Sequence, residues 1–170
     1  MEQYLSLYRS VLDEPQSDSD KVDWHPATVP LQTADQASLR LRLLTLPESV
    51  APRGHFTFQV GLWNGTRVPV ATAAPWPSLL MYRWLDASTG AMVVENGFRS
   101  ILQPPAEPGG ESVYSMRAIA PNRPGDYVLR VTIIQEGWRW LDALRPEVRV
   151  DAPVTIAPEP SVQKVYHATV

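Results

Sequence analysis

Alternation of apolar and polar side chains, which begins near residue 38, limits this chain to one class of fold. In residues 38–46 (SLRLRLLTL) leucines alternate with arginines, and in residues 55–63 (HFTFQVGLW) apolar side chains again occupy every second position. Successive side chains of a β-strand point to opposite faces of the sheet, so this period is typical of strands with one buried face. Both segments are therefore predicted to be strands with one solvent-facing side.

Further strand-like segments follow at near-regular intervals, separated by turn signals. Residues 78–86 (SLLMYRWLD) are apolar on both sides, which predicts a central strand. Shorter or half-buried strands are expected within 91–97, 111–120, 126–134, 146–150 and 152–156. Their connections are turn-like, as in 47–54 (PESVAPRG), the Asn64-Gly65 pair and the proline-rich 103–110. Short strands with regular turns and no intervening helix predict an all-β, immunoglobulin-like antiparallel β-sandwich.

The first 36 residues and the last 13 have a different character. Apolar side chains recur three and four residues apart in residues 1–12, which predicts a short amphipathic N-terminal helix. Residues 13–36 mix acids, serines and prolines and are predicted to form a linker. The sandwich is predicted to occupy residues 37–157, leaving residues 158–170 as a tail or an exchanged strand.

Composition excludes several classes of function. The chain has 170 residues, no cysteine, three separated histidines and a formal net charge of −3. These features predict a domain without disulfides, metal or cofactor, and they give no reason to expect a nucleic-acid partner. The first residues lack a signal-peptide pattern, and no apolar run approaches the roughly 20 residues of a membrane span. A cytoplasmic location is the resulting expectation.

Two aromatic residues are predicted to be structural. Trp84 lies on the predicted central strand, where a tryptophan packs between the two sheets of a sandwich. Tyr127 follows a Pro-Gly-Asp turn at the start of a strand, where tyrosine commonly bonds its hydroxyl to the backbone of the turn. Both are expected in the core and not in a binding site.

The segment EGWRWLDALRP, residues 136–146, contains the strongest candidates for binding. Trp138 and Trp140 are two residues apart and point to the same side of an extended chain, so they form either one core layer or one surface. If one indole is exposed, it can join Trp63 or Trp76 as a flat apolar surface for the C–H face of a sugar. Hydroxyl groups would then bond to polar side chains nearby, for which the candidates are Gln135, Glu136, Arg83 and Arg99. The same composition suits a protein–protein interface, in which Trp and Arg often dominate the binding energy.

Catalysis is not expected. Glu136 and Asp142 could form a carboxylate pair, as in glycosidases whose two carboxyl groups stand about 5 to 10 Å apart. However, the sequence has no nucleophile-elbow motif and no phosphate-binding GxxxxGK[ST] loop. We therefore predict a binding domain that is not an enzyme.

Three stretches carry a resemblance to a known family: YRWLD at 82–86, NGFRSILQPPAEPGGE at 96–111 and APNRPGDYVLRVTIIQEGWRWL at 120–141. They resemble the immunoglobulin-like accessory domains of bacterial surface-polysaccharide machinery, such as the carbohydrate-binding domain of O-antigen ABC transporter ATPases (the Wzt type). The resemblance extends from about Leu39 to Ile156. Trp138 stands where the family often has a small aliphatic residue, and Leu141 where it often has Phe. The resemblance implies non-catalytic binding of an O-antigen-like polysaccharide during the assembly or export of that polysaccharide.

The alternative is a protein-interaction module that holds a glycosyltransferase, a transporter or a second copy of the chain. Residues 161–170 (SVQKVYHATV) are β-prone, and a strand after a proline hinge can pair with the edge of another sheet. Members of the similar transporter family form dimers through their sandwich domains. A homodimer involving the C-terminal segment is therefore predicted, with a disordered tail on a monomer as the other possibility.

Overall fold

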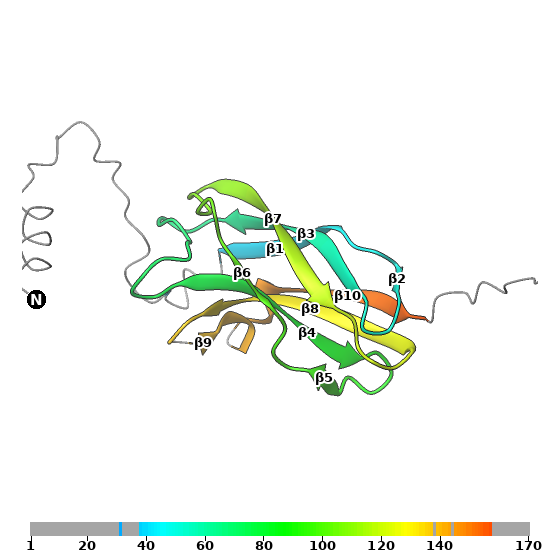
Figure 1. Cartoon of the computed structure of the whole chain (residues 1–170). Coiled ribbons are helices and arrows are strands. Elements are labelled where there is room, and N and C mark those ends of the chain that lie inside the picture. The colour runs from blue at the N-terminus through cyan, green and yellow to red at the C-terminus, as the bar shows by residue number, and fades with distance from the viewer. Residues whose placement is uncertain (1–30, 32–37, 138, 144, 158–170) are drawn as a thin grey trace, which may run out of the picture.

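The chain folds as a two-layer β-sandwich, which Figure 1 shows edge-on. The computed structural model describes residues 31, 38–137, 139–143 and 145–157. The smaller sheet has the strand order β1 (Leu39–Thr45), β3 (His55–Asn64) and β7 (Gly110–Ile119). The larger sheet has the order β2 (Ser49–Val50), β10 (Arg149–Ile156), β8 (Gly125–Gln135), β4 (Ser78–Asp86) and β5 (Met92–Val94). Two short strands complete it: β6 (Arg99–Ile101) pairs with β4, and β9 (Arg139–Trp140) pairs with β8.

The order in which the chain visits the two sheets is that of an immunoglobulin-like domain. The chain crosses from β1 in the smaller sheet to β2 in the larger one, and later from β6 to β7 and back to β8. Strand β2 pairs in parallel with β10, and the other pairings between the strands are antiparallel. The predicted all-β sandwich is therefore confirmed. The predicted N-terminal helix, most of the linker and the C-terminal tail lie outside the described residues.

The core between the sheets is centred on Trp84. Its side chain is fully buried, and the indole N–H donates a hydrogen bond of 2.9 Å to the carbonyl oxygen of Ile119. The rings of Phe56, Tyr82 and Tyr127 surround it edge-on, with centroids 6.2 to 6.5 Å away. The Tyr127 hydroxyl donates to the backbone oxygen of Arg123 at 3.1 Å. Trp84 and Tyr127 are therefore structural, as predicted.

The C-terminal part of the sandwich differs from the prediction of two strands at 146–150 and 152–156. Residues Pro146–Val148 form a single 3-10 turn, η2, and β10 then runs unbroken from Arg149 to Ile156. Pro153 lacks an N–H donor, which a strand tolerates where one of its sides is unpaired. Strand β10 pairs with β8 along its whole length but with β2 only at its last two residues, so at Pro153 the side toward β2 is unpaired. The prolines therefore do not divide the segment into two strands.

Other differences from the prediction concern short strands and the boundary of the sandwich. Strand β2 lies in a segment that was predicted to be a connection, and β6 lies in residues that were assigned to no element; the two strands are only two and three residues long. Leu31 lies in the predicted linker, yet it is 2% exposed, and its N–H donates to the side-chain oxygen of Gln135 at 2.9 Å. The core therefore includes a residue that precedes residue 37, the predicted start of the sandwich. The helices in the described part of the chain, η1 (Leu141–Ala143) and η2, are too short to cross a membrane.

Candidate functional site

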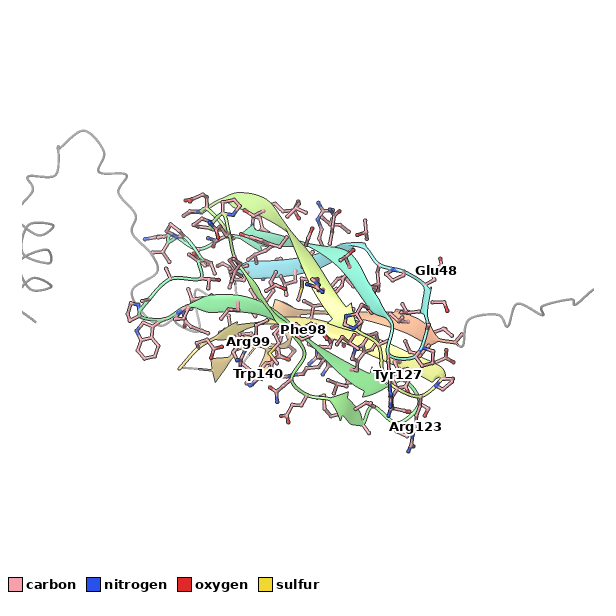
Figure 2. The ribbon with its side chains drawn as sticks, viewed as in Figure 1. Glu48, Phe98, Arg99, Arg123, Tyr127 and Trp140 are labelled. Atoms are coloured by element: carbon pink, nitrogen blue, oxygen red, sulfur yellow. The ribbon has the colours of Figure 1, made fainter. Side chains whose placement is uncertain are left out.

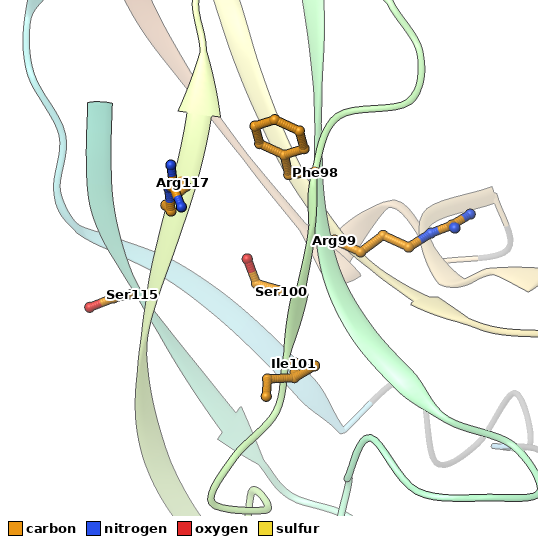
Figure 3. A pocket seen from close by; sticks show the side chains of 6 residues that line it. All are labelled: Phe98, Arg99, Ser100, Ile101, Ser115 and Arg117. Carbon is orange, nitrogen blue, oxygen red and sulfur yellow. The ribbon is translucent and has the colours of Figure 1, made fainter. Parts of the chain in front are cut away.

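The sandwich is open along the edge where β7 faces β6. Strand β7 is the last strand of the smaller sheet, and β6 lies at the edge of the larger one. Between them is a cavity of about 460 Å³ lined by Phe98, Arg99, Ser100, Ile101, Ser115 and Arg117. Figure 3 shows Ser115 and Arg117 on β7 and the other four residues on the opposite segment, with the Ser100 hydroxyl turned toward β7. We call this cavity the edge cleft.

The edge cleft continues in both directions along the sandwich. Phe98 also lines a cavity of about 410 Å³ that reaches Pro121 and Asn122. Ile101 also lines one of about 200 Å³ that reaches Ala71. The three cavities therefore follow one another along the open edge, and we call this row of cavities the groove.

Local packing explains why apolar side chains point into this groove. The N–H of Gly97 donates to the carbonyl oxygen of Tyr82 at 3.1 Å, and a Cβ at residue 97 would lie 2.6 Å from that oxygen and from the tyrosine ring. Only glycine permits this approach. The chain is thus pinned against β4, and the side chains of Phe98 and Ile101 remain 47% and 55% exposed. Such exposure of large apolar groups along one edge is typical of a binding surface.

Several of the predicted binding residues lie together beside the edge cleft, at one end of the larger sheet. Arg99 extends away from the cleft in Figure 3, and its Nε is 3.0 Å from Oε1 of Glu136. Arg83 lies with its guanidinium carbon 3.6 Å from the ring centre of Trp140, a cation–π contact. Figure 2 shows Arg99 and Trp140 in the same region of the molecule. Arg99 joins this cluster to the edge cleft, because its stem lines the cleft while its charge reaches Glu136.

The Arg83 side chain also holds the segment that follows β9. Its Nη1 is 3.1 Å from Oδ2 of Asp142, and the two side chains are only 13% and 4% exposed. Because Arg83 covers one face of the Trp140 indole, that face is not open to a ligand. Glu136 and Asp142, the possible carboxylate pair, are thus each engaged by a separate arginine.

The Gln135 side chain links Trp76 to the interior of the fold, and it is not exposed at the surface. The Gln135 side chain is fully buried, accepts the Leu31 N–H through its oxygen, and donates to the backbone oxygen of Trp76 at 3.2 Å. Trp76 is partly buried, and its ring lies 3.5 Å from where a Cβ of Gly137 would be. The amide of Gln135 is therefore not at a surface where a sugar could reach it.

Trp63 lies apart from the other candidates. It is 43% exposed near the end of β3, in the smaller sheet. The structure therefore does not bring Trp63 together with Trp140. Trp138 lies outside the described residues, so the arrangement of the predicted tryptophan pair stays a prediction.

The residues of the edge cleft, apart from Arg99, were missed from sequence. In residues 111–120 the alternation places Tyr114 and Met116 inside, so Ser115 and Arg117 could have been assigned to the outer face. The alternation could not show that β6 of the larger sheet lies beside β7, so that residues of both strands line one cavity. The described part of the chain has no group of three or more His, Cys, Asp or Glu that could hold a metal ion.

Comparisons with known proteins give matches only among solved structures. No protein-family model matches the chain, and no curated protein matches it. Among solved structures, it is similar to the CARDB domain of PF1109 from Pyrococcus furiosus, with a TM-score of 0.46 and 14% identity over 72% of this chain and 96% of that one. The likeness is limited to the fold.

Parts of two larger enzymes are similar at the same level. One is a β-glucosidase from Listeria innocua in complex with isofagomine, with a TM-score of 0.46 and 13% identity over 69% of this chain but 16% of that one. The other is a family 123 glycoside hydrolase from Clostridium perfringens, with a TM-score of 0.42 and 8% identity over 71% of this chain and 27% of that one. At such identities and TM-scores, neither enzyme indicates what this chain binds or does.

Proposed function

We propose that this protein is a non-catalytic domain that binds a bacterial surface polysaccharide, such as an O-antigen-like glycan, during its assembly or export. The edge cleft carries the proposal, because it combines an exposed phenyl ring, two hydroxyl groups and a guanidinium group in one cavity of about 460 Å³. That volume lies within the range of roughly 300 to 1,000 Å³ found for small-molecule sites. The resemblance of the sequence to polysaccharide-recognising accessory domains supports the same class of ligand.

Each part of the cleft suits one part of a sugar. The exposed ring of Phe98 offers a flat apolar surface for the C–H face of a pyranose. The hydroxyls of Ser100 and Ser115 can both donate and accept hydrogen bonds, as sugar hydroxyls do. The groove continues beyond the cleft toward Ala71 and toward Asn122, so a polymer could pass through it without needing a chain end.

A non-catalytic role fits the same arrangement. The carboxylates nearest the cleft in the predicted cluster are engaged by arginines, so neither is poised as a general acid or nucleophile. A cytoplasmic location and no cofactor belong to the same proposal, as the sequence predicts. In this view the domain holds the glycan and leaves its chemistry or transport to a partner.

Calorimetric titration with oligosaccharides cut from O-antigen polysaccharides tests the proposal. Phe98→Ala should weaken binding about tenfold or more, since truncating an aromatic anchor commonly costs over 1 kcal/mol. Trp63→Ala is the matched control, because Trp63 has similar exposure but lies away from the cleft. Absence of binding to every glycan, or equal weakening by both variants, would contradict the cleft as the site.

A second candidate function is protein–protein interaction through the edge of the sandwich that contains the cleft. The exposed apolar residues along this edge include Met92, Val93, Phe98 and Ile101. Strand β7 has ten residues in an unbroken register with β3, and no other described strand pairs with its free side. Such an edge can accept a strand of another chain. A glycosyltransferase, a transporter or a second copy would be the partner.

The predicted homodimer can be tested directly. Light scattering of the full chain and of a chain lacking residues 158–170 measures the mass of each. A dimer that becomes a monomer on truncation would support exchange of the C-terminal segment. A monomer in both cases, or an unchanged dimer, would contradict it.

A further inference from the structure

We propose that the glycan is acidic, and that Arg117 binds its carboxylate or phosphate group. This inference rests on the proposed glycan-binding function and names the class of glycan. The chain has 18 acidic and 15 basic residues, but the residues lining the edge cleft and its two continuations include two arginines and no Asp or Glu.

Arg99 does not supply the free charge. Its Nε is 3.0 Å from Glu136, and Figure 3 shows its guanidinium turned away from the cleft. The positive charge that remains in the cleft is that of Arg117.

Arg117 differs from several other arginines on the two sheets in that its charge is not paired with a carboxylate of the described residues. Arg42, Arg83, Arg99 and Arg130 each form an ion pair with an Asp or Glu. Arg117 forms none with any residue that the structure describes. Its cross-strand partner on β3 is Thr57, and Ser115 and Ile119 are its neighbours on the same face of β7. No carboxylate stands at these positions, so the charge is not balanced within the sheet.

The geometry of the cleft allows the anion and the sugar to be bound together. A guanidinium group presents its N–H donors in a planar fork that matches a carboxylate or a phosphate. Ser115 lies two residues before Arg117 on β7, and Ser100 faces β7 from across the cleft in Figure 3. Phe98 completes the lining on the same side as Ser100. A charged substituent can therefore reach Arg117 while the ring that carries it contacts the phenyl group and the Ser100 hydroxyl.

The charge of Arg117 favours an acidic glycan over a neutral one. An exposed arginine can remain hydrated, so it does not by itself demand a partner. However, a cleft lined by an arginine and lacking carboxylates gives an anionic glycan an attraction that a neutral one lacks. Hydrogen bonds to charged groups are roughly twice as strong as neutral ones, so the preference should be measurable.

Titration with three oligosaccharides of equal length tests the inference: a neutral one, one containing a uronic acid and one bearing a phosphate. We expect the intact protein to bind at least one acidic oligosaccharide about tenfold to a hundredfold more tightly than the neutral one. The two acidic probes separate a carboxylate from a phosphate as the recognised group. The preference should shrink as salt concentration rises, because the charge of Arg117 is exposed.

Arg117→Gln should reduce the ratio of acidic to neutral affinity to near one, and Arg117→Lys should keep part of it, because lysine retains the charge without the fork. Arg67→Gln is the matched control: Arg67 is also exposed, forms no ion pair with a described residue and lies outside the three cavities. Thermal melting of each variant checks that the fold is kept. Equal binding of neutral and acidic probes by the intact protein, or a preference that survives in Arg117→Gln, would overturn the inference and leave the proposed function standing. No binding of any probe would overturn both.

Discussion

The two long edges of the sandwich differ in how much apolar surface they leave exposed. On one edge, β1 and β2 come from a single stretch of chain that leaves the smaller sheet and joins the larger one, where β2 pairs with β10. On the other edge, the chain crosses from β6 in the larger sheet to β7 in the smaller one, and no ladder joins these two strands. Figure 1 shows both arrangements in one view. We call them the closed edge and the open edge.

The difference shows how one fold can be stable and still present a binding surface. On the closed edge, Leu39 of β1 is fully buried in the core between the two sheets. On the open edge, Ile101 is 55% exposed and Phe98 is 47% exposed. Burial of apolar surface stabilises the fold by about 25 cal/mol per Å², so side chains left exposed contribute little to it. Substitutions at the closed edge should therefore affect stability, and those at the open edge should affect binding.

Trp84→Ala should have the largest effect, because this residue is at the centre of the core. It is fully buried in the middle of the larger sheet, and its indole N–H bonds to the end of β7 at Ile119. Truncating a buried tryptophan leaves a large cavity and typically costs about 3 to 5 kcal/mol. Urea denaturation should show this loss in the free energy of unfolding, and Trp63→Ala should lose far less. A loss below about 1 kcal/mol for Trp84→Ala would mean that the core is not organised around this ring.

Leu39→Ala and Ile101→Ala compare the two edges directly. Each change removes an aliphatic side chain from a strand, but Leu39 is fully buried and Ile101 is more than half exposed. We expect Leu39→Ala to lower the free energy of unfolding by about 2 to 4 kcal/mol and Ile101→Ala by less than about 0.5 kcal/mol. The same denaturation curves measure both. Similar losses would show that the open edge is buried in solution, for example by another chain.

Sequence patterns predicted the parts of this fold that depend on one strand at a time. The alternation in residues 38–46 and 55–63, the central position of 78–86 and the structural roles of Trp84 and Tyr127 all follow from local periodicity and from neighbouring turn residues. Such features need no knowledge of which strands pair. The pattern failed for β2 and β6, because a strand of two or three residues has too few side chains to show a period.

The candidate site was harder to predict because it depends on distant parts of the chain. Arg99 and Glu136 were both selected from sequence, yet their ion pair and the connection to the cleft follow from β6 and β8 lying on either side of β4. Arg117 meets Ser100 only because β7 crosses to the other sheet. Composition alone also favoured Gln135, whose amide is instead used to bind Leu31 and Trp76. Residue type suggested the ligand chemistry, but topology decided which side chains share a surface.

Tyr127→Phe should have a smaller effect, confined to one end of the groove. The change keeps the buried ring and removes only the hydrogen bond from the hydroxyl to the Arg123 oxygen. A hydrogen bond of this kind contributes about 0.5 to 1.5 kcal/mol to the free energy of unfolding. Because the loop before Arg123 includes Pro121 and Asn122 of the groove lining, hydrogen exchange in that loop should also increase. Unchanged exchange there would show that the tyrosine supports the core but not the groove.

The smallest effect should come from the exposed turn between β4 and β5, and it should appear only in acid. Oδ1 of Asp86 accepts hydrogen bonds from the Ser88 hydroxyl at 2.6 Å and from the Thr89 N–H at 2.8 Å. These bonds, with that from the Ser88 hydroxyl the strongest, lower the pKa of Asp86 from 3.8 to about 2. A lowered pKa means that the folded state favours the charged carboxylate, so the turn is stabilised above a pH of about 4 and loses that contribution as the pH falls toward about 2.

Asp86→Asn tests this expectation, because asparagine keeps an oxygen acceptor but does not titrate in this range. The free energy of unfolding should fall less steeply between about pH 4 and pH 2 in the variant than in the unaltered protein, with little difference near neutral pH beyond a small constant offset. The control is Glu95→Gln, an exposed carboxylate just after β5, which should leave the slope nearly unchanged. If Asp86→Asn also leaves the slope unchanged, the turn does not hold the charged form in solution.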